Sequence, residues 1–229
     1  PFPEPAEEGL GASAGGKLYV SAGLAPGGKP KGMVYEYDPA TDKWTKKKSM
    51  ALASHHVAVT ELGGKIYLFG GFVLPASGPA GWQPIDNAFE YDPATDNWKA
   101  LAPMPTKRGA AGAAAAGGKL YVIGGATVLP GAKETAVHPA RAHRSLTTVE
   151  EYDPANNTWR ERSMMPTPRN HLAIGAVNDK IYVLGGRIGA AFISGGGNRL
   201  DLVEEYDVAA DSWNAVRARM PTARSAVAY

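Results

Sequence analysis

The chain has 229 residues, no Cys, and 24 Lys or Arg against 22 Asp or Glu, which gives a formal net charge of +2. Without Cys it cannot form a disulfide framework, a Cys-ligated metal centre or a thiol nucleophile, and its nearly balanced charge gives no general attraction for nucleic acid or an anionic membrane. Its 28 Gly and 18 Pro are too many for a helical bundle and too dispersed for a disordered tail, so they favour an all-β fold with many turns.

One segment, from a Tyr-Asp pair to a Trp, recurs four times. The copies are Tyr37–Trp44, Tyr91–Trp98, Tyr152–Trp159 and Tyr206–Trp213. A Lys that opens an apolar run ending in two small residues precedes each copy, as Lys17–Gly23, Lys65–Gly71, Lys119–Gly125 and Lys180–Gly186. The spacing from Asp to Trp is always 6 and from Trp to the next Lys always 21, whereas the spacing from Lys to Asp is 21, 27, 34 or 27. All length variation therefore falls in one loop per repeat, as expected when a fixed unit carries its variable surface on one face.

Each repeat predicts the same series of short strands. In the second repeat, His56–Thr60 predicts a first strand, and Gly63-Gly64 predicts a tight turn before the strand Lys65–Gly71. The nearly continuous apolar character of that second strand indicates burial on both faces. A third strand ends at the Tyr-Asp pair, where Asp-Pro predicts a turn, and a fourth begins at the Trp.

The third repeat contains an alanine-rich segment, Gly109–Ala116, with the composition of a helix. Gly109 and Gly112 interrupt it, and it aligns without a gap to the first-strand region of the second repeat, His55–Leu62. We therefore predict a strand. Alanine suits this strand because strands near a common axis leave little room for side chains.

Four short strands per unit of about 50 to 60 residues are typical of propeller blades. We place the repeats at about 1–48, 49–102, 103–163 and 164–218, with 219–229 as the start of a further repeat. The large area that a Trp side chain buries favours a packing role for the four repeat Trp residues.

The repeats resemble those of the Kelch-repeat β-propellers, which carry a Gly-Gly pair, a Tyr-Asp pair and a spaced Trp. The match is close in Gly70-Gly71, Tyr91-Asp92 and Trp98 and at the equivalent positions of the third and fourth repeats. In the first repeat Ala22-Gly23 replaces the Gly pair, which puts in doubt only the close backbone contact there. The resemblance implies an all-β propeller of four four-stranded blades plus the first strand of a fifth.

Propellers have roughly four to eight blades, so this stopping point leads us to expect a segment of a larger propeller. In the alternative, the C-terminal strand replaces the weak strand expected at 10–14 and closes a four-bladed ring.

One group of candidate ligand-binding residues lies just before the innermost strands. The group contains three arginines that occupy the same position of different repeats, and three side chains that lie two residues after that position. They are Arg108, Arg169, Arg224, Glu8, His56 and His171. In the family these segments line the mouth of the central channel, so the resemblance implies a pocket in which Arg donates to carboxylates or sulfates. The alternative is structural, with the Arg side chains bonding neighbouring loops between blades and the His side chains held within the fold.

The variable loops are the second candidate. The longest, 126–148, carries a basic set against a single Glu134: Lys133, His138, Arg141, His143 and Arg144. The loop 72–88 carries Trp82, which lies outside the repeat pattern. An exposed Trp near Arg and His suits a peptide or carbohydrate ligand, and the alternative is a solvated loop with Trp82 packed on the scaffold.

We therefore predict a non-catalytic recognition scaffold that binds a protein, peptide or glycan through its variable-loop face. The sequence has no His-Glu-x-x-His pattern and no acidic calcium loop, and we expect no catalytic residue, metal, cofactor, nucleic-acid partner or membrane span. Residues 1–4 lack the pattern of a signal peptide, and localisation stays open, with a secreted or periplasmic protein allowed.

The alternative is a carbohydrate-active enzyme, because related propellers include a copper galactose oxidase and a sialic acid mutarotase. The oxidase cofactor requires a Cys-linked Tyr, which a chain without Cys cannot supply. Mutarotase-like chemistry requires Arg with acid or His groups around a sugar, and Arg108, Arg169, Glu8 and His171 are the residues that would provide it.

Overall fold

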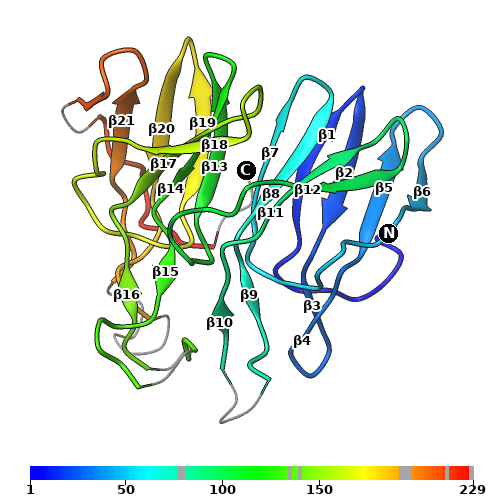
Figure 1. Cartoon of the computed structure of the whole chain (residues 1–229), viewed down its shortest axis with the longest axis horizontal. Helices are drawn as coiled ribbons and strands as arrows, with labels where there is room; N and C mark the ends of the chain where they lie inside the picture. The colour runs from blue at the N-terminus through cyan, green and yellow to red at the C-terminus, as the bar shows by residue number, and fades with distance from the viewer. Residues whose placement is uncertain (77–80, 134–135, 139–140, 191–197, 215–216, 227–229) are drawn as a thin grey trace.

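The computed structural model describes residues 1–76, 81–133, 136–138, 141–190, 198–214 and 217–226, and in these ranges the regular structure is entirely β (Figure 1). Four antiparallel sheets of four strands follow one another along the chain. Each falls within one of the repeat ranges predicted from the sequence. Across the described ranges, no helix has the length and apolar character needed to cross a membrane.

The four sheets, here called blades 1 to 4, have the same strand order. Blade 1 contains β1 (Leu10–Ala14), β2 (Lys17–Ser21), β5 (Val34–Asp38) and β6 (Lys43–Lys46). Blade 2 contains β7 (Ala58–Leu62), β8 (Lys65–Phe69), β11 (Ala88–Asp92) and β12 (Asn97–Ala100). Blade 3 contains β13 (Gly112–Ala116), β14 (Lys119–Ile123), β17 (Val149–Asp153) and β18 (Thr158–Glu161). Blade 4 contains β19 (Ala173–Val177), β20 (Lys180–Leu184), β21 (Val203–Asp207) and β22 (Ser212–Trp213).

Three two-stranded ribbons extend from one end of the blades, at the bottom of Figure 1, and we call this the loop-bearing end. They are formed by the variable loops of the first three repeats: β3 (Leu24–Ala25) with β4 (Lys29–Pro30), β9 (Phe72–Val73) with β10 (Gln83–Pro84), and β15 (Ala126–Thr127) with β16 (Arg144–Ser145). The variable loops of the first three repeats thus lie at one end of the propeller.

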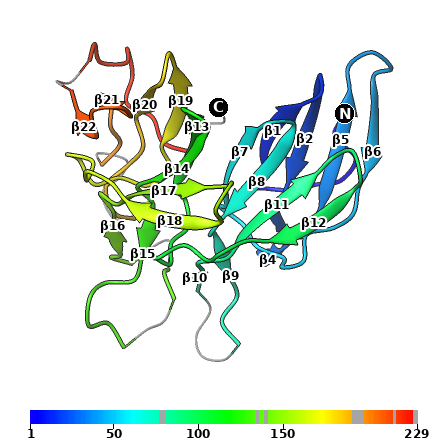
Figure 2. The ribbon, with the colours of Figure 1, turned by 45° about the horizontal axis from the view of Figure 1, so that its top comes forward.

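The first strand of each blade is its inner strand, and β1, β7, β13 and β19 pack against one another in chain order (Figure 2). The predicted alanine-rich strand is β13, which lies between β7 and β19. A Cβ atom on Gly112 would lie 2.4 Å from Leu172 Cδ1 and 2.9 Å from Ile174 Cγ2. This spacing explains why small side chains occupy the strand.

The apolar core lies between neighbouring blades. Blades 1 and 2 bury Tyr19 and Val34 against Ile66, Leu68 and Tyr91. Corresponding clusters join blade 2 to blade 3 and blade 3 to blade 4. The second strand of blade 2 therefore has little exposed apolar surface, as predicted for Lys65–Gly71, because the last four residues of β8 are buried. The second strand of blade 1 is less covered, since Leu18 is 41% exposed.

In the second, third and fourth repeats, the Tyr, the Trp and the Asp or Asn five residues after the Tyr join the blade to the one before it. In blade 2, Tyr91 Oη donates to Asp96 Oδ1 at 2.7 Å, and the Lys48 amide of blade 1 donates to the same oxygen at 2.9 Å. The Trp98 indole donates to the Lys48 carbonyl at 2.9 Å. The same three bonds recur around Asn157 and Asp211 in blades 3 and 4. The repeat Trp residues thus have the packing role predicted from the sequence.

The small-residue pair brings each blade close to the chain that follows it. The amides of Gly71, Gly125 and Gly186 donate to the carbonyls of Arg108, Arg169 and Arg224. The structure gives no corresponding bond from Gly23 in blade 1, where Ala22 holds a left-handed φ of 64°. The missing bond is the close backbone contact that the replacement of Gly by Ala22 had put in doubt.

The alternative in which a C-terminal strand replaces residues 10–14 is wrong for the described chain. Leu10–Ala14 forms β1 and pairs with β2. The C-terminal segment bonds instead to blade 4, through a bridge between Arg224 and Leu200.

Candidate functional site

The segments that lead into the inner strands all lie at the loop-bearing end, because each one bridges to the residue that begins a variable loop. These bridges join Glu7 to Leu24, His55 to Phe72, Gly109 to Ala126, and Asn170 to Arg187. The residue after each bridge has a left-handed backbone: Glu8, His56, Ala110, His171 and the equivalent Ala226, at φ between 51° and 57°. We call these five the lead-in positions.

Backbone hydrogen bonds link the lead-in positions in succession from His56 to Ala226. The Ala110 amide donates to the His56 carbonyl at 2.8 Å, and the His171 and Ala226 amides donate to the carbonyls of Ala110 and His171 at 2.9 Å. Ala110 adds only a methyl group between the two histidines, whose rings meet at a centroid distance of 4.9 Å. Residues separated by 115 positions in the sequence are therefore neighbours.

Glu8, His56 and His171 form a cluster, here called the His–Glu cluster, with one member from each of blades 1, 2 and 4. Glu8 Oε2 lies 3.3 Å from His56 Nε2. Arg187 Nη2 donates to His171 Nε2 at 2.9 Å, and because Arg is only a donor, this nitrogen must be an acceptor. His171 Nδ1 then carries the proton and donates to Asn170 Oδ1 at 2.6 Å.

Burial controls protonation in the His–Glu cluster. It lowers the pKa of His56 and of His171 well below the usual value, with the neighbouring histidines and Arg187 adding to the effect. Burial also lowers the pKa of His55 to about 4, and it raises the pKa of Glu8 against the opposing charge of Arg187. The imidazoles are therefore neutral near pH 7.

Trp82 covers the histidines from the loop of blade 2. Its ring lies 5.0 Å from the ring of His55 and 4.9 Å from that of His56, between centroids. The Trp82 and Val137 amides donate to each other's carbonyls at 2.7 Å, which joins the loops of blades 2 and 3. Trp82 is half-buried, so the structure places it against the scaffold, with part of its surface still accessible.

Arg108 and Arg169 lie within their blades. The Arg108 side chain is fully buried and donates to Glu150 Oε2 at 2.9 Å, and Arg169 forms the corresponding buried pair with Glu204. Neither guanidinium has surface for a ligand. Their role is structural, but each pairs with a strand of its own blade and not with the neighbouring loops between blades that the alternative from the sequence predicted.

The repeats contain a signal for these ion pairs. Those with Arg before the inner strand have Glu150 or Glu204 two residues before the Tyr of the Tyr-Asp pair, whereas those with Ala6 or Ser54 have Tyr35 or Phe89 there.

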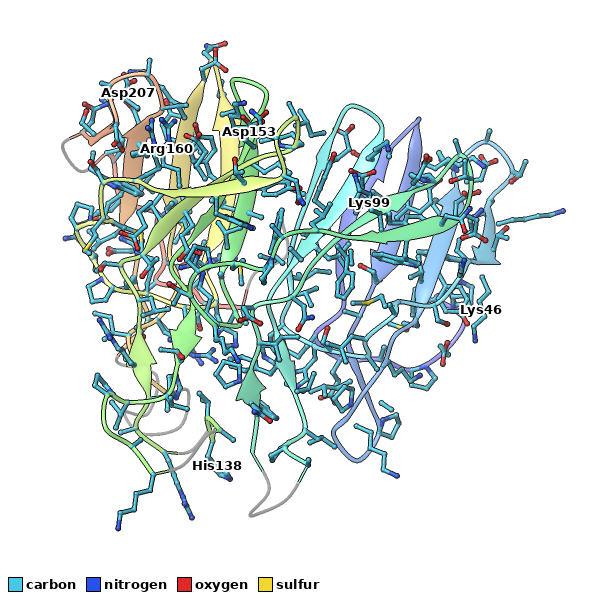
Figure 3. All side chains as sticks on the ribbon, viewed as in Figure 1. Lys46, Lys99, His138, Asp153, Arg160 and Asp207 are labelled. Carbon is cyan, nitrogen blue, oxygen red and sulfur yellow. The ribbon has the colours of Figure 1, made fainter. Side chains whose placement is uncertain are left out.

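The remaining predicted residues lie at the loop-bearing end. Arg141 and Arg144 are exposed, and His143 is half-buried, close enough to His171 for its charge to lower that residue's pKa. Lys133 is exposed and His138 half-buried, whereas Glu134 lies outside the described residues. Figure 3 shows His138 in the loop below β15 and β16.

Arg224 lines an open cleft of about 490 Å³ on blade 4, together with Arg199, Thr222, Ala223, Ser225 and Ala226. Arg187 connects this cleft to the His–Glu cluster, since Arg187 Nη1 lies 3.4 Å from Ser225 Oγ. Sequence reasoning missed Arg187 and Arg199. The sequence did contain a signal for Arg187. It directly follows the small-residue pair of its repeat, and the equivalent positions in the other repeats hold the apolar residues Leu24, Phe72 and Ala126.

Known proteins share both the repeats and the fold. A family model described as the KLHDC2/KLHL20/DRC7 Kelch-repeats domain matches residues 9–228. Kelch-like protein terF of Aspergillus terreus is 29% identical over 228 residues, covering 98% of this chain and 47% of the relative. Kelch-like protein 25 of Xenopus tropicalis is 27% identical over 190 residues, covering 81% of this chain and 30% of the relative. The chain thus spans less than half the length of these relatives.

A solved structure described as "Structure of YjhT" has the same fold. It matches with a TM-score of 0.74 and 22% identity, over 98% of this chain and 68% of that one. Together with the match over residues 9–228, this confirms the expectation drawn from the repeats: the chain belongs to the Kelch-repeat family of β-propellers.

Proposed function

We propose that this propeller is a recognition module that binds a carboxylate-bearing segment of a protein partner at its loop-bearing end. The observation that carries the proposal is the open cleft of about 490 Å³, where Arg199 and Arg224 lie beside the hydroxyls of Thr222 and Ser225. Both arginines are exposed, and among the described residues neither forms an ion pair with a carboxylate. Arg224 Nε donates to Thr222 Oγ1 at 2.6 Å, which leaves the two terminal nitrogens of that guanidinium for a ligand.

The chemistry of the cleft favours an anionic group. A guanidinium presents two parallel N–H donors that match a carboxylate, and hydroxyls add further donors. None of the described residues that line the cleft is acidic. Lys29, Arg141 and Arg144 are exposed on the ribbons at the same end, which adds a field that attracts acidic segments and favours rapid association.

The surrounding loops favour an extended ligand over a small molecule. The backbone pairing of Trp82 with Val137 joins two loops into one rim, and partly exposed Trp side chains are frequent anchors in protein interfaces. An open cleft beside such a rim offers contact along a peptide segment, whereas small-molecule sites are usually enclosed.

The test is binding of the purified chain to a set of synthetic Asp- and Glu-containing peptides and their Asn and Gln counterparts. We expect acidic peptides to bind, with a salt-sensitive affinity that Arg224→Gln and Arg199→Gln each weaken about tenfold. Lys99→Gln is the matched control, because Figure 3 shows this exposed lysine on β12, away from the ribbons. Equal binding of the acidic and amide peptides would rule out recognition of the carboxylate.

The second candidate is a sugar-transforming enzyme, favoured by the carboxyl group of Glu8, with its raised pKa, close to neutral imidazoles. Of the four residues first considered for this chemistry, Glu8 and His171 share the cluster, whereas Arg108 and Arg169 lie buried in ion pairs. NMR measurement of anomer exchange in sialic acid, with and without the protein, tests this candidate. An unchanged exchange rate would exclude it.

A further inference from the structure

Three side chains from different blades point their ligating atoms at one another at the loop-bearing end. One atom each from Glu8, His56 and His171 lies within 4.8 Å of the other two. We propose that the His–Glu cluster is a binding site for one divalent transition-metal ion, best matched by Zn²⁺, with Glu8 Oε2, His56 Nε2 and His171 Nε2 as ligands.

The spacing suits this ion. Ligand atoms about 2.0–2.1 Å from Zn²⁺ in a tetrahedral arrangement are roughly 3.3–3.4 Å apart. Glu8 Oε2 and His56 Nε2 lie 3.3 Å apart, so this pair already has the separation of two zinc ligands. The third atom requires a small approach of the His171 ring, which lies against that of His56 at 4.9 Å.

The outer nitrogens of both imidazoles are held by neighbouring side chains. His171 Nδ1 donates to Asn170 Oδ1, and His56 Nδ1 shares a hydrogen bond with His55 Nδ1 at 2.5 Å. Metal-binding histidines are usually oriented in this way by a hydrogen bond from the nitrogen that does not bind the metal. The arrangement leaves both Nε2 atoms out of these bonds: that of His56 lies 3.3 Å from Glu8 Oε2, and that of His171 accepts from Arg187.

The chemistry of the three groups agrees with their geometry. Two imidazoles and one carboxylate form a common ligand set for divalent transition metals. The Glu8 side chain is 38% exposed whereas that of His56 is 2% exposed, so an ion reaches the cluster from the side of Glu8.

Arg187 is the group that competes with the ion. Its Nη2 donates to His171 Nε2 at 2.9 Å and must leave that lone pair before a metal binds. Ser225 Oγ, 3.4 Å from Arg187 Nη1, offers the guanidinium a partner in the adjoining cleft. Removing the positive charge of Arg187 should therefore tighten metal binding, whereas a purely structural hydrogen-bond cluster would give no such effect.

The experiment is calorimetric titration of the metal-free chain with Zn²⁺ alone, near neutral pH. We expect one equivalent to bind, Glu8→Gln and His171→Gln each to weaken the affinity at least about tenfold, and Arg187→Met to strengthen it about tenfold. His138→Gln is the control, since this histidine lies in the loop below β15 and β16 (Figure 3).

Circular dichroism verifies that each variant folds. If a histidine variant unfolds, Glu8→Gln still tests the metal site, because the Glu8 side chain is partly exposed and its replacement should leave the fold intact. With Co²⁺ in place of Zn²⁺, visible absorption should report a tetrahedral site in the wild type that is lost in Glu8→Gln. The proposal is overturned if the wild type binds no stoichiometric Zn²⁺, or if the ligand variants bind it as tightly as His138→Gln does. Neither result bears on peptide binding.

Discussion

Replacing Gly70 with Ala tests how the small-residue pair joins one blade to the next. Gly70 has a left-handed φ of 59°, and a Cβ atom there would lie 2.3 Å from the Arg108 carbonyl oxygen on the next blade. That oxygen also accepts the Gly71 amide at 2.9 Å. Ala at this position must therefore strain its own backbone and push away a neighbouring main chain that cannot rotate aside.

Three costs combine at Gly70. The left-handed conformation costs an Ala roughly 1–2 kcal/mol, forced overpacking roughly 1–3 kcal/mol, and the weakened Gly71 bond roughly 0.5–1.5 kcal/mol. We expect Gly70→Ala to lower the free energy of unfolding by about 3–6 kcal/mol. Gly63→Ala is the matched control, because Gly63 has a φ of 63° with no atom within 4 Å of the added Cβ. It should lose only the conformational part, about 1–2 kcal/mol.

Urea denaturation followed by circular dichroism measures both variants against the wild type, with the slope of the transition showing whether the unfolded states are comparable. Equal losses for Gly70→Ala and Gly63→Ala would refute the reasoning, since the conformational cost is shared and only the contact with Arg108 differs. The first repeat supports the expected direction, because Ala22 occupies the equivalent position and the corresponding bond from Gly23 is missing there.

Two further predictions concern charged groups. Arg108→Met should lower the free energy of unfolding by about 3–5 kcal/mol, because it leaves Glu150 buried without its partner. In urea denaturation, adding Glu150→Leu to this variant should recover most of the loss. No recovery would contradict the pairing. Desolvation raises the pKa values of Asp96 and Asp211, but hydrogen bonds from a Tyr hydroxyl and a backbone amide outweigh it, so both pKa values are lowered. The stability that these carboxylates contribute is therefore present above a pH of about 4 and should be lost as the pH falls below it. In melting curves from pH 7 to pH 2.5, the double variant Asp96→Asn and Asp211→Asn should lose less stability in acid than the wild type, and an identical acid profile would exclude this cause.

The fold was predictable because its signals are local and repeated. Constant spacings define each blade, and the alignment of Gly109–Ala116 with another first strand corrects its helical composition. The bonds of Asp96, Asn157 and Asp211 were not recognised, although an Asp or Asn recurs there five residues after each Tyr. A left-handed backbone at these residues, which Asn and Asp tolerate well, accompanies the bonds to the preceding blade.

The site was only partly predictable because it depends on contacts between repeats. Alignment identified the positions of Glu8, His56 and His171, and the resemblance implied a pocket among the aligned residues, but neither indicated which of their side chains meet. It also gave Arg108 and Arg224 the same expected role, whereas the first is buried against Glu150 and the second is exposed in a cleft. A side chain's surroundings in the assembled propeller decide between these roles, and the repeat pattern does not encode them.

The lead-in positions explain why blade and site vary independently. Their links between blades use only main-chain atoms, as in the bonds from Ala110 to His56 and from His171 to Ala110. His and Ala each make those links, and Glu, His and Ala all have the same left-handed backbone at a cost of order 1 kcal/mol that a Gly would avoid. The fold therefore does not require a particular side chain at the lead-in positions. It does bring these side chains together at the loop-bearing end. Chemistry at this end can change through substitution at a lead-in position while the blades, fixed by the Tyr, Trp and Gly positions, stay the same.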